Sequence, residues 1–237
     1  AMSIQTRAPS QELGGNVSAT VGEDKDFRIK GTISGPISET LSARIAAGYL
    51  TYDGWGKNAA DPKDNLGGTE KYAVNASLLW GPSPNFKARL SGFITHSKTE
   101  QTPVSLLPLQ SFNCGTTSAA AATAGFKQLY CGELKASKVS NVTVGTPDTL
   151  ARSRQVSLEL EGHLSGVQVV SVTGLTRADN RSYNDYDGTA AGIPFGVCTL
   201  GAACSPAGAY SRLANVNLVV SGREKVRTFS QEVRLQS

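Results

Sequence analysis

The sequence lacks any long apolar run. None of its segments reaches the roughly 18 consecutive apolar residues that a membrane-spanning helix needs. Hydrophobic residues make up 39% of the 237 residues, a low share for a protein with a large buried core. A spanning helix is therefore excluded, whereas a sheet with a single apolar face is compatible with this composition.

Other function classes also lack their usual signals. The net charge is +4, and the basic residues are scattered without interleaved aromatics, which argues against nucleic-acid binding. With two histidines and no Gly-x-Ser-x-Gly elbow, the chain offers no nucleophile with an acid–base partner. We therefore expect no catalytic residues and no enzyme activity. A signal peptide is not visible either.

The four cysteines form two pairs inside long polar segments. Cys114 and Cys131 bracket a stretch rich in Gly, Ala and Thr, and Cys198 and Cys204 bracket Thr-Leu-Gly-Ala-Ala. Because the close Cys-x-x-Cys spacing and the histidine partners of zinc sites are missing, we expect no metal site. Two loop-closing disulfides are predicted in preference to free thiols. Disulfides indicate an oxidising compartment such as the periplasm or the cell exterior.

Apolar and polar side chains alternate along eight segments. In residues 72–80 one face carries Tyr72, Val74, Ala76, Leu78 and Trp80, with an aromatic at each end. A period of two is typical of a β-strand, and these nine residues span about 26 Å, or about 20 Å along the membrane normal at a barrel tilt. The same alternation marks residues 16–21, 27–34, 41–49, 86–94, 156–164, 167–177 and 229–235.

The connections between these segments sort by length. Turns near residues 36, 82 and 165 are short, whereas segments near 60, 125 and 200 are long and polar. The remaining turn, near residue 24, is short but falls on the long-loop side. Outer-membrane barrels have short periplasmic turns and long extracellular loops, whereas a soluble sandwich has no reason to sort its loops. Both cysteine pairs fall on the long-loop side.

Charged side chains also sort within the strands. Arginine or lysine facing lipid at the bilayer centre costs about 2–4 kcal/mol, whereas a charge facing a wet lumen costs little. These observations predict an all-β fold: the wall of an antiparallel transmembrane β-barrel with about eight strands. The alternative is the solvated face of a soluble sheet. The charges on the polar face are Arg28, Lys30, Arg44, Lys87, Arg89, Glu159, Glu161, Glu232 and Arg234.

Three stretches carry a family resemblance. Residues 3–10 read Ser-Ile-Gln-Thr-Arg-Ala-Pro-Ser, residues 31–54 contain Ser-Gly-Pro-Ile-Ser and end on Tyr-Asp-Gly, and residues 229–237 read Phe-Ser-Gln-Glu-Val-Arg-Leu-Gln-Ser. In this order they resemble the end of the plug domain, the first barrel hairpin with the next strand, and a mid-barrel strand of TonB-dependent outer-membrane receptors. The order and spacing carry the resemblance, which covers nearly the whole chain.

The resemblance implies a part of a larger protein. Receptors of this family have about 22 strands around an N-terminal plug. We therefore expect residues 1–10 to end the plug or link it to the barrel, and residues 11–237 to form the N-terminal portion of the barrel. The missing signal peptide and a chain that stops within a strand pattern agree with this expectation. The alternatives are a complete eight-stranded outer-membrane barrel and a secreted β-rich adhesin or binding module.

The resemblance also implies a function and a location. Its members lie in the bacterial outer membrane and take up a scarce nutrient, most often an iron–siderophore complex. Energy comes from the TonB–ExbB–ExbD complex through the plug. The partners expected for this chain are that complex, outer-membrane lipid and a small-molecule ligand such as a metal chelate. We expect no cofactor and no nucleic acid.

Two sets of side chains are candidates for the site. Aromatics at junctions between strand and loop are candidates for ligand contact or, alternatively, for the interfacial girdle: Tyr52, Trp55, Tyr183 and Tyr186. A second set is predicted to face the lumen: Arg44, Arg89, Glu159, Glu161, Glu232 and Arg234. Arg44 and Arg89 either line a path for an anionic ligand or form salt bridges and contacts to the plug.

Overall fold

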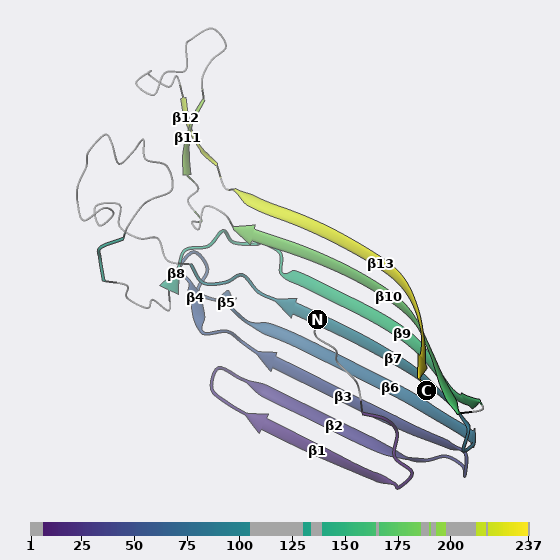
Figure 1. Cartoon of the computed structure of the whole chain (residues 1–237). Coiled ribbons are helices and arrows are strands. Elements are labelled where there is room, and N and C mark those ends of the chain that lie inside the picture. Colours follow the sequence, from purple (N-terminus) through teal and green to yellow (C-terminus); the bar gives the residue numbers. More distant parts are fainter. Residues whose placement is uncertain are drawn as a thin grey trace.

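An eight-stranded antiparallel sheet dominates the structure (Figure 1). The computed structural model describes residues 7–104, 130–133, 139–164, 166–185, 190, 193–197, 212–216 and 218–236. Each strand of the large sheet pairs with the next one in the chain, as in a meander. These strands are β1 (Gly14–Val21), β2 (Phe27–Pro36), β3 (Leu41–Tyr52), β6 (Thr69–Ser83), β7 (Phe86–Thr99), β9 (Thr149–Leu164), β10 (Val167–Asp185) and β13 (Val219–Gln236).

All eight predicted strands are present, and each is longer than predicted. The largest extensions are in β13, which begins at Val219, and β10, which ends at Asp185, and β9 begins early, at Thr149. In these extensions the backbone pairing continues beyond the segment in which apolar and polar residues alternate. The alternation therefore underestimates the length of the strand. The turn predicted near residue 82 lies slightly later in the chain. Residues 81–83 belong to β6, where a register shift between Trp80 and Ser83 shortens the connection to residues 84–85.

The predicted sorting of connections is confirmed. Residues 37–40, 84–85 and 165–166 connect strands at one end of the sheet, and residues 22–26, 53–68, 100–148 and 186–218 connect them at the other. Figure 1 shows the short strands that belong to the long connections beyond one end of the large sheet. We call these the turn end and the loop end.

The long loops contain short strands that the sequence did not predict. β4 (Gly56–Asn58) pairs with β5 (Asn65–Leu66) and, in parallel, with β8 (Val139–Ser140). β11 (Ile193–Val197) and β12 (Arg212–Val216) form a separate antiparallel hairpin. Elements of two to five residues leave almost no periodic signal in a sequence.

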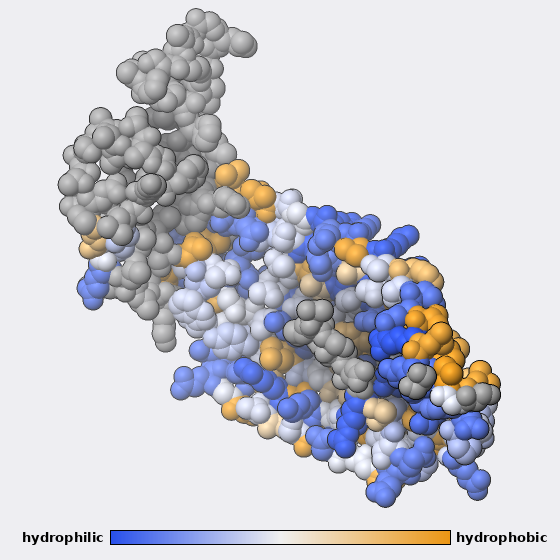
Figure 2. Space-filling model, viewed as in Figure 1, coloured by the Kyte–Doolittle hydropathy of each residue, from blue (hydrophilic) through white to orange (hydrophobic). Residues whose placement is uncertain are grey.

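Register divides the large sheet into two chemically different faces. The outer face carries Leu78, which lies opposite Ala43 of β3 and Leu90 of β7. The inner face carries the alternating residues, such as Ser77 opposite Arg44. Outer-face side chains of β6 are exposed, whereas the inner-face residues between them are half-buried or buried. Figure 2 shows hydrophilic and near-neutral residues over most of the described surface on the side of the sheet that the view presents.

The N-terminal segment, residues 7–13, lies against the inner face. The backbone N–H of Ser10 donates to Ser34 Oγ over 2.8 Å, and Ser34 Oγ donates to the carbonyl of Ala43 over 3.2 Å. Pro9 is buried. The same segment passes so close to Gly35 that a Cβ there would lie 2.9 Å from a Leu13 methyl. Glycine at position 35 therefore lets the chain enter β1 across the end of β2.

Aromatic pairs mark the two edges of the apolar outer face. Near the loop end, Tyr72 stacks on His96 with ring centroids 5.0 Å apart. Near the turn end, Trp80 meets Phe86 edge-on at 5.9 Å. Aromatic side chains at both edges of an apolar band are typical of the girdles that flank the lipid-facing band of a barrel. Among the described residues, no helix is long and apolar enough to cross a membrane.

Candidate functional site

A hollow of about 550 Å³ lies on the inner face near the loop end of β2, β3, β6 and β7. The cations Arg28, Lys30 and Lys71 line it together with hydroxyl-bearing side chains such as Thr20 and Thr95. No carboxylate of the described residues lines the hollow. Strand alternation brings these side chains together, since residues two apart on one strand and paired residues on the next share a face.

The three cations differ in how far they are neutralised. Arg28 donates from Nε and Nη2 to the two carboxylate oxygens of Asp26, each over 2.8 Å. These hydrogen bonds lower the pKa of Asp26 below its usual value, so the pair stays ionised. Neither Lys30 nor Lys71 forms an ion pair within the described part of the chain. The hollow therefore carries two uncompensated positive charges, which suit an anionic ligand.

The six charges predicted to face the lumen all lie on the inner face. Arg89 forms a salt bridge of 2.5 Å with Glu159, directly across the β7–β9 pair. Glu161 accepts a hydrogen bond from Gln168 Nε2 over 2.9 Å. Arg234 donates to both oxygens of Glu232, over 2.6 and 3.0 Å. That this face borders a lumen stays a prediction, but four of its six predicted charges form salt bridges, as on a wet, polar surface.

Arg44 and Arg89 do not line the hollow of about 550 Å³. Arg44 is half-buried between Ser34 and Ser77 of the neighbouring strands. Arg89 lines a second, smaller hollow of about 210 Å³ together with Lys87, Glu161 and Ala8 of the N-terminal segment. This arrangement favours the structural interpretation of Arg89, in which it pairs with a carboxylate beneath the chain that covers the inner face.

The predicted aromatic candidates do not form one site. Tyr52 ends β3 on the inner face, whereas Tyr183 lies near the end of β10 on the outer face. Trp55 follows β3 in the loop and is 44% exposed. None of these three lines the hollow of about 550 Å³. Tyr186 lies outside the described residues, so a role in ligand contact stays a prediction for all four.

A small folded unit covers the loop end of β6 and β7, and we call it the loop cap: residues 53–68, 100–104 and 139–148. Leu66 and Val142 are its core, at 1% and 2% exposed. Asn58 is 1% exposed and ties distant segments together. Its Nδ2 donates to the Val142 carbonyl over 3.0 Å, and its Oδ1 accepts from the Val142 N–H over 3.2 Å.

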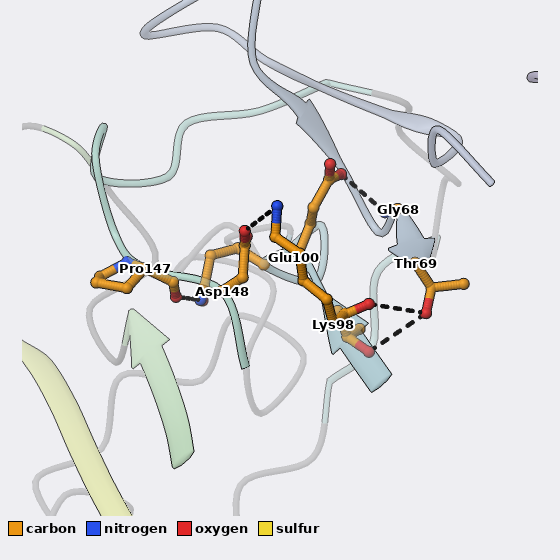
Figure 3. A network of polar contacts seen from close by, with 8 residues as sticks. Gly68, Thr69, Lys98, Glu100, Pro147 and Asp148 are labelled. Carbon is orange, nitrogen blue, oxygen red and sulfur yellow. Dashed lines mark hydrogen bonds and ion pairs between the residues drawn. The ribbon is translucent and has the colours of Figure 1, made fainter. Parts of the chain in front are cut away.

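Figure 3 shows how polar contacts join the loop cap to the strand ends. Glu100 accepts a hydrogen bond from the Gly68 N–H over 3.0 Å, and Lys98 pairs with Asp148 at 3.0 Å. Burial raises the pKa of Glu100, and the hydrogen bond from Gly68 opposes that shift. A Cβ at Gly68 would lie 2.2 Å from the Glu100 carboxylate, so a larger residue at position 68 would displace that carboxylate from the Gly68 N–H.

Cys131 is the one cysteine within the described residues, and it is disulfide-bonded. Cys114, Cys198 and Cys204 lie outside the described residues, so the predicted pairing is not tested. The part of the chain that the structure describes contains no group of three His, Cys, Asp or Glu side chains that would hold a metal ion.

Sequence reasoning missed a set of cations on the outer face of β9, β10 and β13. Six of them lie outside the predicted strand segments, and Arg177 is the last residue of the predicted segment 167–177. The signal was present, because Arg152 and Arg154 continue the alternation of Val156 and Leu158 without a change of phase. The members of the set are Arg152, Arg154, Arg177, Arg181, Arg223, Lys225 and Arg227.

Comparison with known proteins shows what this fold is similar to. No family model and no curated protein matches the chain. Among solved structures, the ferric-catecholate import receptor Fiu of E. coli K12 in its open form matches over 97% of this chain and 32% of its own, with a TM-score of 0.66 and 13% identity.

Two further receptors give the same result. The ferric yersiniabactin uptake receptor FyuA of Yersinia pestis matches over 75% of this chain and 27% of its own (TM-score 0.52, 15% identity). The siderophore receptor PirA of Acinetobacter baumannii matches over 94% and 27% (TM-score 0.50, 14% identity). The chain therefore spans a third or less of the length of these receptors. The resemblance seen in its sequence extends to its structure: the chain has the same fold as part of each of these receptors.

Proposed function

We propose that the chain forms part of the barrel wall of an outer-membrane receptor that takes up a ferric siderophore or a similar anionic metal chelate. The observation that carries the proposal is the cation-lined hollow on the inner face, close to the loop end. Two receptors of similar fold import ferric catecholates and ferric yersiniabactin, which are both ferric chelates. Many such complexes are anionic, because several deprotonated oxygens surround each ferric ion. Lys30 and Lys71 supply the complementary charge.

The same proposal assigns roles to the remaining parts. Residues 1–10 end the plug or link it to the barrel, and residues 11–237 belong to the barrel wall. The inner face of the sheet borders the plug and the path of the ligand. Uptake draws energy from the TonB–ExbB–ExbD complex acting through a plug. Disulfides between Cys114 and Cys131 and between Cys198 and Cys204 fix the extracellular loops.

Charge reversal at the hollow tests the proposal. The receptor carrying Lys30→Glu and Lys71→Glu is compared with the parent for binding of a ferric catecholate, followed by quenching of intrinsic fluorescence. We expect affinity to fall by about tenfold or more for each reversed charge, as partly screened charges a few ångströms from an anion are worth on the order of 1 kcal/mol. Lys63→Glu, in the exposed part of the loop cap, is the control.

The outcomes separate binding from transport. Energy-dependent import is supported if the parent still binds the ferric catecholate in the presence of an uncoupler but no longer takes up labelled iron. Equal affinity of the double variant and the parent would refute the role of the hollow. Uptake that continues unchanged without a proton-motive force would refute coupling through TonB.

A further inference from the structure

Seven cations form a cluster on the outer face, on three neighbouring strands. The register sets them in rows across β9, β10 and β13: Arg154, Arg177 and Arg227 in the first row, Arg152, Asp179 and Lys225 in the second, and Arg181 with Arg223 in the third. We call these seven cations the outer cation cluster. Asp179 is the one carboxylate within these three rows.

The cluster belongs to the face that carries the apolar band. Arg154 lies opposite Ile94 of β7, whose side chain is 46% exposed on the outer face. Arg152 lies opposite His96 and donates from Nε to His96 Nδ1 over 3.3 Å. His96 in turn stacks on Tyr72 of the aromatic edge. The cluster is therefore continuous with the aromatic edge near the loop end and points away from the hollow on the inner face.

The height of the cluster follows from the strand geometry. Below the first row, β9 presents Val156, Leu158, Leu160 and Leu164 to the outer face. Residues 156–164 span about 26 Å along the strand, or about 20 Å along the membrane normal. The first and second rows lie about 5 and 10 Å above this band by the same arithmetic. A headgroup region is about 5–8 Å deep on each side of a bilayer, so these rows lie at or just above headgroup level.

Polar groups within the band below the cluster are paired with one another. Gln231 of β13 accepts a hydrogen bond from Thr173 over 2.5 Å and donates to Ser171 over 3.0 Å. Mutual pairing lowers the cost of placing these groups against hydrocarbon. The band therefore stays compatible with lipid up to the row where the cations begin.

Most of the positive charge in the cluster is uncompensated. Arg223 donates to both oxygens of Asp179, over 2.6 and 3.0 Å, and Arg181 lies 3.7 Å from the same carboxylate. The remaining cations Arg154, Arg177, Lys225 and Arg227 have no ion pair within the described residues. They surround a shallow hollow of about 300 Å³ with Arg152 and Asp179.

We propose that the outer cation cluster binds phosphate groups of phosphorylated lipid headgroups in the outer leaflet. This inference rests on the membrane placement in the proposed function. A lipid fits better than a soluble anion, because the phosphate-binding groups stand directly above an apolar surface that acyl chains would cover. Arginine, which makes up most of the cluster, binds phosphate oxygens with two parallel N–H donors.

The test compares three proteins in vesicles. They are the parent, the variant Arg154→Gln/Arg177→Gln/Arg227→Gln, and the control Lys25→Gln/Lys57→Gln/Lys63→Gln, which removes equal charge from exposed loops. Flotation with neutral phosphatidylcholine vesicles first measures membrane insertion. Vesicles that also contain bis-phosphorylated lipid A then serve as the probe, and the lipid A retained by the detergent-extracted protein is quantified by mass spectrometry.

We expect all three proteins to float and the outer-face variant to retain at least tenfold less lipid A than the parent and the control. A variant with lysine at the same three positions should recover part of the retention. Equal retention by all proteins would overturn the inference, and so would displacement of lipid A by inorganic phosphate at equal concentration, which indicates a soluble-anion site. Unchanged lipid retention with loss of a larger protein complex would overturn it in favour of a protein partner.

Failure of the inference is distinguishable from failure of the proposed function. A parent protein that does not float with neutral vesicles would refute the membrane placement itself. A parent that floats but shows no selective retention of lipid A would refute only the role of the outer cation cluster.

Discussion

The barrel wall and the loop cap use their apolar residues in opposite ways. On the outer face of the wall, Ile33 is 57% exposed and Leu235 is 70% exposed, whereas Ser42 of the inner face is fully buried. In the loop cap, Leu66 and Val142 are buried, whereas the charged side chains of Lys57 and Lys63 are exposed. Water favours the second arrangement, so the first one indicates that a non-aqueous environment covers the wall. The outer face of the wall is therefore suited to lipid, whereas the loop cap is suited to water.

The largest effect is expected from a charge placed in the core of the loop cap. Leu66→Asp should destabilise the cap by about 4 kcal/mol or more, because a carboxylate without a partner is buried. Hydrogen exchange of residues 53–68 measures the change, and the strands of the wall should keep their protection. Val144→Asp, at a cap position that is 51% exposed, is the matched control. Equal loss of protection in both variants would contradict the distinction between core and surface.

A charge placed on the outer face of the wall tests whether that face meets hydrocarbon. Leu78→Arg should lower the free energy of unfolding from vesicles by about 2–4 kcal/mol, the cost of arginine facing hydrocarbon. Asn75→Arg, three residues away on the inner face, should change it by much less. Denaturant titration in phosphatidylcholine vesicles gives both values. Similar costs at the two positions would mean that the two faces of β6 meet the same environment.

Removing the side-chain amide of Asn58 tests what holds the segments of the loop cap together. Asn58→Ala leaves the buried N–H and carbonyl of Val142 without their partners, which should cost about 1–3 kcal/mol. Limited proteolysis of the cap reports this loss. Asn65→Ala, which removes an exposed partner of Lys57, provides the comparison. A cap that resists protease equally in both variants would show that the contacts of Asn58 are dispensable.

The smallest effect concerns pH. Burial raises the pKa of Glu100 in the folded state, so its contribution to stability is fully present below its unfolded pKa of about 4.3. That contribution is lost as the pH rises through the higher folded pKa. Cap stability, measured by hydrogen exchange, should therefore decline above about pH 4.3 in the parent. Glu100→Gln keeps the acceptor for Gly68 and should remove this part of the decline. An unchanged profile would exclude Glu100 as its source.

The sequence predicted the wall better than the cap for a physical reason. Alternation reports which face of a strand meets hydrocarbon, so the segments of β3 and β6 were recognisable without a structure. The cap is held by contacts between distant residues, such as Asn58 with Val142, which leave no periodic trace. The outer cations were missed because Arg154 carries a charge where the pattern required an apolar residue. That break in the pattern marks the upper limit of the apolar band, where the outer cation cluster begins.

Accessibility along β6 tests the central claim most directly. Spin labels are placed one at a time at positions 73 to 78 in vesicles, and their collisions with oxygen and with a water-soluble nickel chelate are compared. Outer-face positions 74, 76 and 78 should favour oxygen, whereas inner-face positions 73, 75 and 77 should favour the chelate. An alternation of period two is the predicted result. Chelate access to both faces alike would contradict the assignment of the outer face to lipid.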